Sequence, residues 1–567
     1  MASCSSGCSG TRWGNEARTA GPGLIEHTPS PPGGGATAAA ASTSAFAPLS
    51  APVFRMLWSV WLIANTCMWM NDVAAAWLMT SLTTSPVMVA LVQTASTLPV
   101  FLLGLPSGAL ADIVDRRRYL MTTQLWIAGN ATLLCLAIAS GLVSAPLLLA
   151  LTFVNGIGLA MRWPVYSALI PELVPRAQMP AALALNGVAM NGSRIIGPIV
   201  AGMLIAGAGT IWVFVLNAVL SLVAVLVIWR WRREPKANAL PGERFIGAMR
   251  VGVQYVRQSA RMRTVLFRIA MFFAHSTALL ALLPLIARQM PGGGAGTYTM
   301  LLASMGTGAI MSALFLPGWR KRFSSDELVR RGSLVQAGTM VAVGFSPNLW
   351  VAVPFMVICG VSWLTVANTL GVSAQLSLPN WVRARGMSMY QMSLMGGGAL
   401  GAALWGQVAT LTDLRSSLVL AALSGTAILW LTRSRLLDDA VDEDLTPVHP
   451  RSPPEAAWPV AQGDGPVLVM IEYQIDPARA DDFREVMRET RRRRLAQGAL
   501  SWELFRDSAD PARFVEYVVD ESWLEQRRRF ERLTAADEAL RERRLAFHVG
   551  SEPPKVTRCI ADPLARR

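Results

Sequence analysis

Several ionisable side chains lie within long apolar stretches of this sequence, and Asp72 is the clearest of them. Every other acid between Met56 and Arg433 falls in or beside a polar connection. A carboxylate inside hydrocarbon is costly unless it is paired, hydrated or protonated. Asp72 could therefore load a proton from one side of a membrane and release it to the other. Two alternatives stay open: a static pair with an arginine, and a hydrated position at the outer mouth of a helix bundle.

Arg162, Arg194 and His275 lie in three other apolar stretches. The two arginines must face protein or a water-filled cavity, because facing lipid would cost several kcal/mol. Arg194 could neutralise Asp72, hold an anionic substrate or only bond neighbouring helices. His275 could titrate near neutral pH, or stay neutral and bonded to a neighbouring helix. With Asp72, these residues are the candidates for proton coupling or substrate binding.

The composition indicates a polytopic membrane protein. Of the 567 residues, 52% are hydrophobic and only 16% are charged, which is too apolar for a soluble protein of this size. The net charge of +14 would suggest nucleic acid in a soluble chain, but orientation in the membrane explains it without a nucleic-acid partner. The six cysteines lack metal-ligand spacing, and no lysine follows a glycine as in a phosphate-binding loop. We therefore expect no metal and no cofactor.

Twelve apolar segments are each long enough to cross roughly 30 Å of hydrocarbon at about 1.5 Å per residue. Their approximate limits are 56–80, 86–108, 118–140, 146–170, 182–206, 210–230, 264–287, 297–317, 328–345, 349–372, 385–408 and 414–433. Alternate connections hold nearly all the arginines and lysines, whereas the other connections hold only Arg288 and Arg415. Such one-sided charge predicts an even number of crossings and cytoplasmic termini.

The longest internal connection divides the apolar region into two sets of six segments. The sets resemble each other weakly, since Leu105 with Asp115 recurs at the same spacing as Leu316 with Asp326. Parallel repeats of this kind build transporters around a site between the halves. The predicted organisation is a disordered segment at 1–50, six-helix halves at 51–230 and 264–435, and a cytoplasmic central loop at 231–263.

An acidic and Pro-rich linker at 436–465 precedes a soluble domain at 466–567, here called the tail. Its pattern predicts strands at 467–475, 500–505, 513–519 and 555–560, and helices at 477–496, 522–533 and 535–547. The order βαββααβ suggests a small cytoplasmic α+β domain of the ferredoxin-like type.

The charged connection after the second segment resembles the signature loop of the major facilitator superfamily. The matching residues are Gly108, Leu110, Asp112, Arg116 and Arg117, with Ile113 and Asp115 where arginine and glycine are usual. The resemblance implies a gating role, in which Asp112 and Arg116 form a charge-assisted pair that latches neighbouring helices in one state. The alternative is that the arginines only set topology by attracting anionic headgroups.

Further motifs resemble one group within that superfamily, the transmembrane secretion effectors, to which the enterobactin exporter is similar. They are Leu98-Pro99, residues 171–176 and residues 191–198 with Gly202. This resemblance covers about residues 46–435. The tail resembles the antibiotic-biosynthesis-monooxygenase-like fold through residues 498–502, 506–507 and 522–525.

Small residues in two apolar segments predict close helix packing. Gly197, Pro198 and Gly202 indicate a pliable, tightly packed segment. Gly397 and Gly401 belong to a run that matches GxGxxG, but no strand precedes it, so packing is favoured over dinucleotide binding. We expect both small-residue faces at the interface between the halves.

Together these features predict an all-α membrane protein of the major facilitator fold, in two six-helix halves, with the α+β tail. The resemblance implies a secondary active exporter, a proton antiporter for a small amphiphilic molecule such as a siderophore or drug, in a bacterial inner membrane. The tail has no evident acid–base set, since His548 is its only histidine and Gln526 stands where such domains often have another. We expect it to dimerise or regulate. The alternatives are a membrane-tethered monooxygenase-like enzyme and a sensor that does not transport.

Overall fold

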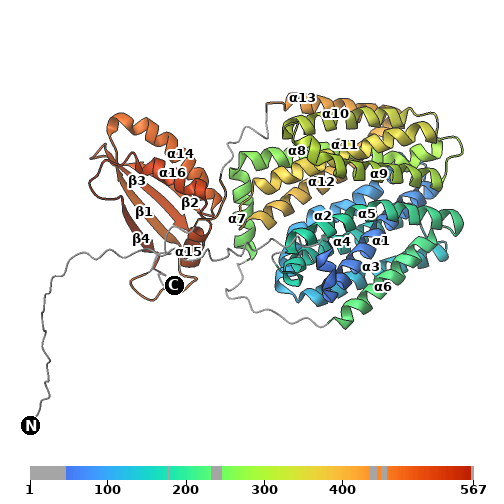
Figure 1. Ribbon diagram of the computed structural model, residues 1–567, viewed down its shortest axis with the longest axis horizontal. Coiled ribbons are helices and arrows are strands. Elements are labelled where there is room, and N and C mark those ends of the chain that lie inside the picture. Colours follow the sequence, from blue (N-terminus) through green and yellow to red (C-terminus); the bar gives the residue numbers. More distant parts are fainter. Residues whose placement is uncertain (1–45, 176–177, 232–244, 435–443, 449–455, 563–567) are drawn as a thin grey trace, which may run out of the picture. The chain divides into compact units, whose positions relative to one another are not determined.

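The structure is a computed structural model that describes residues 46–175, 178–231, 245–434, 444–448 and 456–562. Its long helices fall into two sets, followed by a small sheet with helices (Figure 1). The first set is α1 Pro52–Leu82, α2 Pro86–Ile113, α3 Arg116–Ala139, α4 Ala145–Leu173, α5 Met179–Gly207 and α6 Ile211–Arg230. The second is α8 Ala260–Gln289, α9 Ala295–Arg320, α10 Ser325–Gly344, α11 Leu349–Leu376, α12 Arg383–Leu411 and α13 Leu414–Leu431.

Within the described residues, nine of these helices are long and apolar enough to cross a membrane. Helices α1, α10 and α12 are of comparable length but do not reach the same hydropathy. In α1 the difference has a visible source, because Asn65, Asn71 and Asp72 interrupt its apolar sequence. The prediction of membrane-crossing helices is thus supported for nine of the twelve segments.

Local signals account for the helix ends. Proline occupies the first turn of α1, α2 and α4, where no intrahelical N–H is needed. Asp115 is the N-cap of α3, and its side chain accepts a hydrogen bond from the backbone N–H of Arg118 at 2.9 Å. Asp115, one of the two residues that depart from the signature pattern, therefore has a structural role of its own.

Helix packing repeats between the two sets. In the first set α1 packs on α5, α2 on α4 and α3 on α6; in the second set α8 packs on α12, α9 on α11 and α10 on α13. Each pair occupies the same place in the order of its own set. The two sets meet mainly where α2 packs on α12 and α5 packs on α9. The weak sequence repeat thus corresponds to a repeated three-dimensional arrangement.

Glycines bring some of these helices into backbone contact. A β-carbon at Gly401 would lie 2.1 Å from the carbonyl oxygen of Ala274, and one at Gly397 would lie 2.3 Å from that of Ala270. Both glycines therefore pack on α8 within the second half, and Gly197 likewise packs on α1 within the first half, beside Trp69.

The expectation that these small-residue faces all lie between the halves was therefore partly wrong. Of the predicted glycines, Gly202 does face the other half, at Thr299 of α9. Gly396, one residue before Gly397, faces Phe101 of α2. Neighbouring helical residues point about 100° apart, so one glycine run can serve two different partners. Pro198 lies inside α5.

Two predicted irregular segments contain ordered structure. Helix α7, Phe245–Gln258, occupies much of the predicted central loop, and its apolar side chains Val251, Tyr255 and Val256 are buried. Residues 232–244 lie outside the described residues. Most of the predicted disordered segment also lies outside them, but Ala47–Ser50 form a short 3₁₀ helix.

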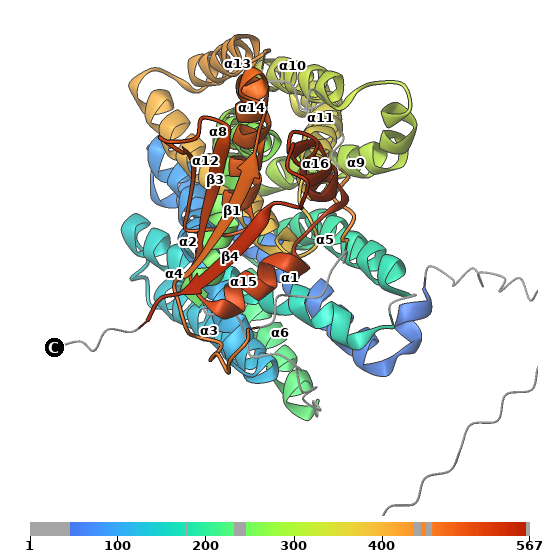
Figure 2. The same cartoon turned by 90° about the vertical axis from the view of Figure 1, so that its left-hand side faces the viewer.

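The tail has the predicted order of elements. These are β1 Val467–Gln474, the 3₁₀ turn Pro477–Arg479, α14 Ala480–Ala496, β2 Ser501–Arg506, β3 Arg513–Asp520, α15 Trp523–Glu531, α16 Ala535–Leu545 and β4 Lys555–Ile560. The four strands lie side by side in the order β2-β3-β1-β4, and every neighbouring pair is antiparallel. Figure 2 shows β3, β1 and β4 next to one another in that order. Side chains alternate in burial along β3, as expected for a sheet with one face covered by helices.

A buried carboxylate organises the covered face of this sheet. Glu516 on β3 is fully buried and accepts hydrogen bonds from Tyr473 Oη at 2.9 Å, Trp502 Nε1 at 3.0 Å and Arg494 Nε at 3.1 Å. Burial raises the pKa of Glu516, but the charges of Arg494 and Arg544 and these hydrogen bonds outweigh it and lower the pKa to about 2. The carboxylate is therefore ionised and fully partnered.

We expect Glu516→Gln to lower the free energy of unfolding of the tail by about 3–5 kcal/mol at neutral pH, because Arg494 and Arg544 would stay buried without their counter-charge. Because the pKa of Glu516 in the folded protein lies below its ordinary value of 4.5, the ionised carboxylate stabilises the fold fully at pH values above 4.5. This stabilisation is lost as the pH falls towards about 2. Hydrogen exchange of β3 in the full chain measures the effect. Glu503→Gln, at an exposed position on β2, is the control. Equal protection in the two variants at neutral pH would contradict the assignment.

Candidate functional site

Asp72 lies where the first half meets the second. Its Oδ1 accepts a hydrogen bond from Ser96 Oγ on α2 at 3.0 Å. Tyr298 on α9, in the second half, lies within electrostatic range of the same carboxylate. Among the described residues no arginine or lysine lies within 4 Å of Asp72 in an ion pair. The neutral hydroxyl of Ser96 is therefore the partner that the structure gives this acid.

Arg194 on α5 is held between aromatic rings from both halves. Its Cζ lies 4.2 Å from the ring centroid of Trp363 on α11 and 5.1 Å from that of Trp69 on α1. Phe273 on α8 extends this aromatic group, with its ring centroid 5.2 Å from that of Trp363. Nε and Nη1 of Arg194 are buried without a hydrogen-bond partner. The guanidinium thus retains donors for a further group while its faces bind the two halves through cation–π contacts.

The acid and the arginine occupy neighbouring levels of the interface. Trp69 precedes Asp72 by three residues on α1, which corresponds to about 4.5 Å along the helix axis and to the same side of the helix. Asp72 therefore lies about one helical turn from one of the two indole rings that hold Arg194. Such a site offers an acidic group, unpaired N–H donors and flat apolar surfaces, which together suit an amphiphilic molecule.

The halves close on each other at the arginine-poor end of the bundle. Arg288 at the end of α8 donates to the carbonyl oxygen of Thr80 on α1 at 2.6 Å and lies over Trp77, 5.0 Å from its ring centroid. Trp77 in turn stacks on Tyr298 of α9, with 6.2 Å between ring centroids. Asp72 lies deeper in the bundle than these contacts. Access to it from the arginine-poor end is therefore restricted by side chains of both halves.

Arg162 and His275 lie away from this interface. Arg162 on α4 lines a pocket between α1, α3, α4 and α6, inside the first half. His275 on α8 lines a cavity of about 60 Å³ between α8, α10 and α13, inside the second half. Its Nδ1 lies 2.7 Å from the carbonyl oxygen of Met271, on its own helix. The four candidates from the sequence therefore do not form one site.

Sequence reasoning missed the aromatic partners of Arg194. The spacing of Trp69 and Asp72 could have identified Trp69, since residues three apart share a helix face. Nothing local to Trp363 links it to Arg194, because the two belong to different halves. Tyr298 was missed for the same reason, and Ser96 because it lies on a different helix of the first half from Asp72.

The signature loop spans the end of α2 and the start of α3. Gly108, Leu110 and Asp112 fall in the last turns of α2, and Arg116 and Arg117 begin α3. Arg117 donates through Nε to the carbonyl oxygen of Ile228 at 3.2 Å and through Nη2 to that of Trp229, at the C-terminal end of α6. A cation there also complements the helix dipole. The side chain of Asp112 lies outside the described part of the structure, and so does the predicted pair with Arg116.

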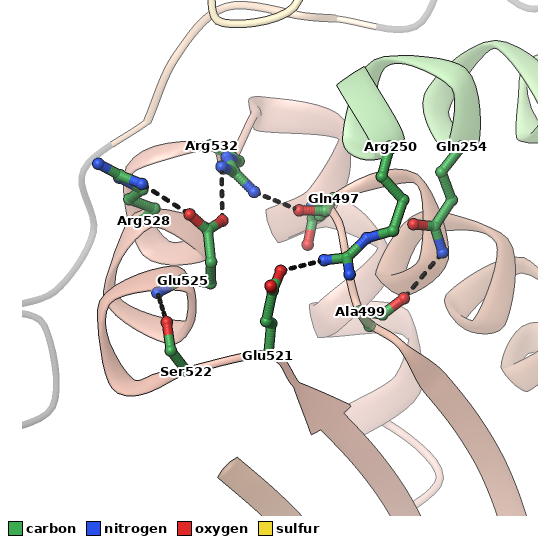
Figure 3. A network of polar contacts seen from close by, with 9 residues as sticks. All are labelled: Arg250, Gln254, Gln497, Ala499, Glu521, Ser522, Glu525, Arg528 and Arg532. Atoms are coloured by element: carbon green, nitrogen blue, oxygen red, sulfur yellow. Dashed lines mark hydrogen bonds and ion pairs between the residues drawn. The ribbon is translucent and has the colours of Figure 1, made fainter. Parts of the chain in front are cut away.

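The tail contacts helix α7 through a small polar network (Figure 3). Arg250 Nη2 lies 2.5 Å from Glu521 Oε2, and Gln254 Nε2 donates to the carbonyl oxygen of Ala499 at 2.8 Å. Gly498 has a left-handed conformation with φ +110°, which glycine adopts without strain. Its missing side chain also lets α7 approach the tail closely, since a β-carbon at this position would lie 3.0 Å from Val251 Cγ2. These contacts join α7 to the turn between α14 and β2 and to Glu521, which follows β3.

Arg532 adds a second contact, to the connection between α11 and α12. Its Cζ lies 5.0 Å from the ring centroid of Trp381. Arg532 also donates to the carbonyl oxygen of Gln497 at 2.8 Å and pairs with Glu525 at 2.9 Å (Figure 3). Burial raises the pKa of Glu525, but the charges of Arg532 and Arg528 outweigh it and lower the pKa overall. An ionised Glu525 therefore fixes the guanidinium that reaches Trp381.

The sequence model of the family described as transmembrane secretion effector matches residues 43–566. The match includes the tail and so extends beyond the region of about residues 46–435 that carried the resemblance. Macrolide efflux protein A of Streptococcus pyogenes is 22% identical over 328 residues, which cover 57% of this chain and 80% of that protein. Its counterpart from Enterococcus faecalis is 24% identical over 274 residues, covering 46% and 84%.

Solved transporter structures share the fold. A variant of the nucleoside transporter NupG aligns with a TM-score of 0.58 at 11% identity, over 68% of this chain and all (100%) of that one. A bacterial homologue of the human lysosomal transporter Spinster, in an inward-facing and occupied conformation, aligns with a TM-score of 0.55 at 16% identity, over 69% and 98%. At these identities the alignments establish the fold of the helical bundle and do not identify a substrate.

We expect Arg194→Met to weaken the closure of the two halves at the arginine-poor end. A cation–π contact is worth about 0.5–2 kcal/mol, and the contact with Trp363 joins the halves, so its loss should shift the equilibrium between open and closed forms by roughly twofold to thirtyfold. Spin labels at Leu142 and Leu411, exposed near that end in opposite halves, report the separation as a distance distribution. Arg415→Met is the control, because Arg415 contacts Phe345 within the second half. Identical distributions for the two variants would refute the clamp.

We expect Arg250→Glu to loosen the tail from α7, because two like charges would then face each other. The pair is partly exposed, so amide exchange in α7 should accelerate by only a few-fold, in line with about 0.2–1 kcal/mol for such pairs. The charge-swapped double variant, R250E with E521R, should restore slow exchange. Arg257→Glu, at an exposed position of α7, is the control. A double variant as fast as the single one would show that the ion pair does not hold the tail.

Proposed function

Because the chain belongs to the transmembrane secretion effector family of transporters, we propose that it exports a small amphiphilic, drug-like molecule by alternating access. The chain is a multi-pass membrane transporter rather than an enzyme, as its family and relatives are. The observation that carries the proposal is the placement of Arg194 between Trp363 and Trp69, next to Asp72, where the halves meet. The relatives act in macrolide efflux, which favours a drug over a siderophore.

The proposal takes all twelve long helices as membrane-spanning, in halves at 51–230 and 264–435. The arginine-rich connections then lie in the cytoplasm of a bacterial cell, with both termini. In that orientation the contacts of Arg288 with Thr80 and Trp77 close the outer side, which corresponds to an inward-facing form. Rocking of the halves would break these contacts and open the site outward.

Proton coupling is assigned to Asp72. In the inward-facing form the neutral Ser96 hydroxyl is the hydrogen-bond partner of its carboxylate among the described residues, so proton uptake costs no ion pair. A protonated Asp72 would lose its attraction for a cationic substrate, and a deprotonated one would regain it. Such competition for one carboxylate makes drug and proton move in opposite directions.

The tail is proposed to be a ferredoxin-like accessory domain of the exporter. The order βαββααβ and the antiparallel sheet order β2-β3-β1-β4 support that fold. Its contacts with α7 and Trp381 support a role in regulating the second half. Strands β2 and β4 are the edges of the sheet, and pairing of such edges between two copies would make the tail a dimerisation domain as well. In that case the full chain would have the molar mass of a dimer in solution, and a chain ending at residue 435 would have that of a monomer.

We expect Asp72→Asn to abolish the dependence of export on a pH gradient. The amide resembles the protonated acid in shape but cannot release a proton. Uptake of a fluorescent cationic drug into inverted vesicles, with and without a gradient, measures the coupling. Asp413→Asn is the matched control, because Asp413 caps α13 in a loop and asparagine caps equally well. Full gradient-driven transport by the Asp72 variant would rule out this residue as the coupling group.

A further inference from the structure

A second polar pocket lies inside the first half, away from the interface between the halves. Its cavity volume is about 10 Å³, and its walls come from α1, α3, α4 and α6. Its polar lining residues are Cys67, Asn155, Arg162, Asn217 and Ser221. Among the described lining residues there is one cation, Arg162, and no carboxylate. The pocket therefore carries a net positive charge.

Arg162 is buried and largely without partners. The residue is 3% exposed. Its Nη1 donates to the carbonyl oxygen of Ala64 at 3.3 Å, and its Cζ lies 5.4 Å from the ring centroid of Trp61. Nε and Nη2 have no hydrogen-bond partner, and in the described part of the chain no acid forms an ion pair with this guanidinium. A guanidinium does not lose its proton in proteins, so its charge has to be compensated in another way.

The neighbouring polar groups can complete an anion site. Asn155 is buried with its Oδ1 unpartnered, and because amide oxygen and nitrogen are interchangeable in such assignments, its N–H₂ group can equally face the pocket. Asn217 donates to Asn71 Oδ1 and Ser221 donates to Asn217 Oδ1, both over 3.4 Å, so these donors are held only weakly. An anion would receive charge-assisted hydrogen bonds from Arg162 and neutral ones from the amides and the hydroxyl.

The size of the pocket limits the occupant. A cavity needs roughly 10–15 Å³ on this measure to hold one water molecule, so the space suits a single monatomic ion or water and excludes a drug-sized molecule. The lining residues include neither Asp72 nor Arg194, and none comes from the second half, so the pocket is separate from the site where the halves meet. We propose that it binds a small inorganic anion of the halide type, which neutralises Arg162 and ties α4 to α1 and α6.

Chloride is the probe that tests the site. Thermal unfolding of the full-length protein in detergent is followed while chloride replaces gluconate at constant ionic strength. A ligand that binds only the folded state raises the unfolding temperature in a saturable way. We expect this saturable rise in the wild type and its loss in Arg162→Gln. Arg230→Gln, at the exposed end of α6, should keep the rise and controls for the loss of one positive charge.

Two further measurements keep the test decisive where Arg162→Gln does not fold. Asn155→Ala retains the guanidinium, and we expect it to weaken chloride binding by about tenfold, the cost of one hydrogen bond to an ion. Bromide soaked into crystals of the wild type should give anomalous density beside Arg162. A wild-type unfolding temperature that does not respond to chloride, or a response of equal size in Arg162→Gln, would overturn the proposal and leave water as the occupant.

Discussion

The cost of placing charge away from water is the constraint on which the rest of this structure depends. In the bundle, Asp72 is partnered by a hydroxyl and Arg194 by ring faces, whereas in the tail Glu516 is partnered by Arg494 directly. The difference follows from what each region must do. A buried ion pair is expensive to break once formed, so it suits a domain that keeps one conformation. Neutral partners leave a charge available to a proton or a ligand when the surroundings rearrange.

The two kinds of helix contact divide the bundle into rigid bodies. Within each half, backbones touch at glycines, as Gly401 does with Ala274, and such contacts cannot slide without a clash. Between the halves, many contacts join side chains or a side chain to a backbone group, such as Arg288 with Thr80 and Gly202 with Thr299. Side chains can change rotamer or partner at little cost. The surface between the halves therefore includes contacts that can be remade when the halves rock.

Sequence patterns predicted what depends on local chemistry. The strands of the tail were placed within about two residues because alternation and turn residues are local signals, and the helices of the bundle were found from apolar length. The rotation of a helix about its axis is not local, so Arg162, Arg194 and His275 could be placed at a depth but not on a face. Asp115 shows that a local signal can be overlooked when a sequence is compared with a family pattern. In that pattern Asp115 stands where glycine is usual, and in the structure it is the N-cap of α3.

The tail is coupled to one half of the bundle by the position of its contacts in the chain. Helix α7 directly precedes α8 in the chain. Trp381 lies between α11 and α12, and both of these helices pack on α8. Tyr255 of α7 donates to the carbonyl oxygen of Ser377 at 2.9 Å and meets Trp381 edge-on, so α7 and that connection form one surface. A domain resting on this surface moves with the second half. If the tail regulates transport, as proposed, a partner on one of its edge strands would favour one position of that half over another by touching the tail in that position alone.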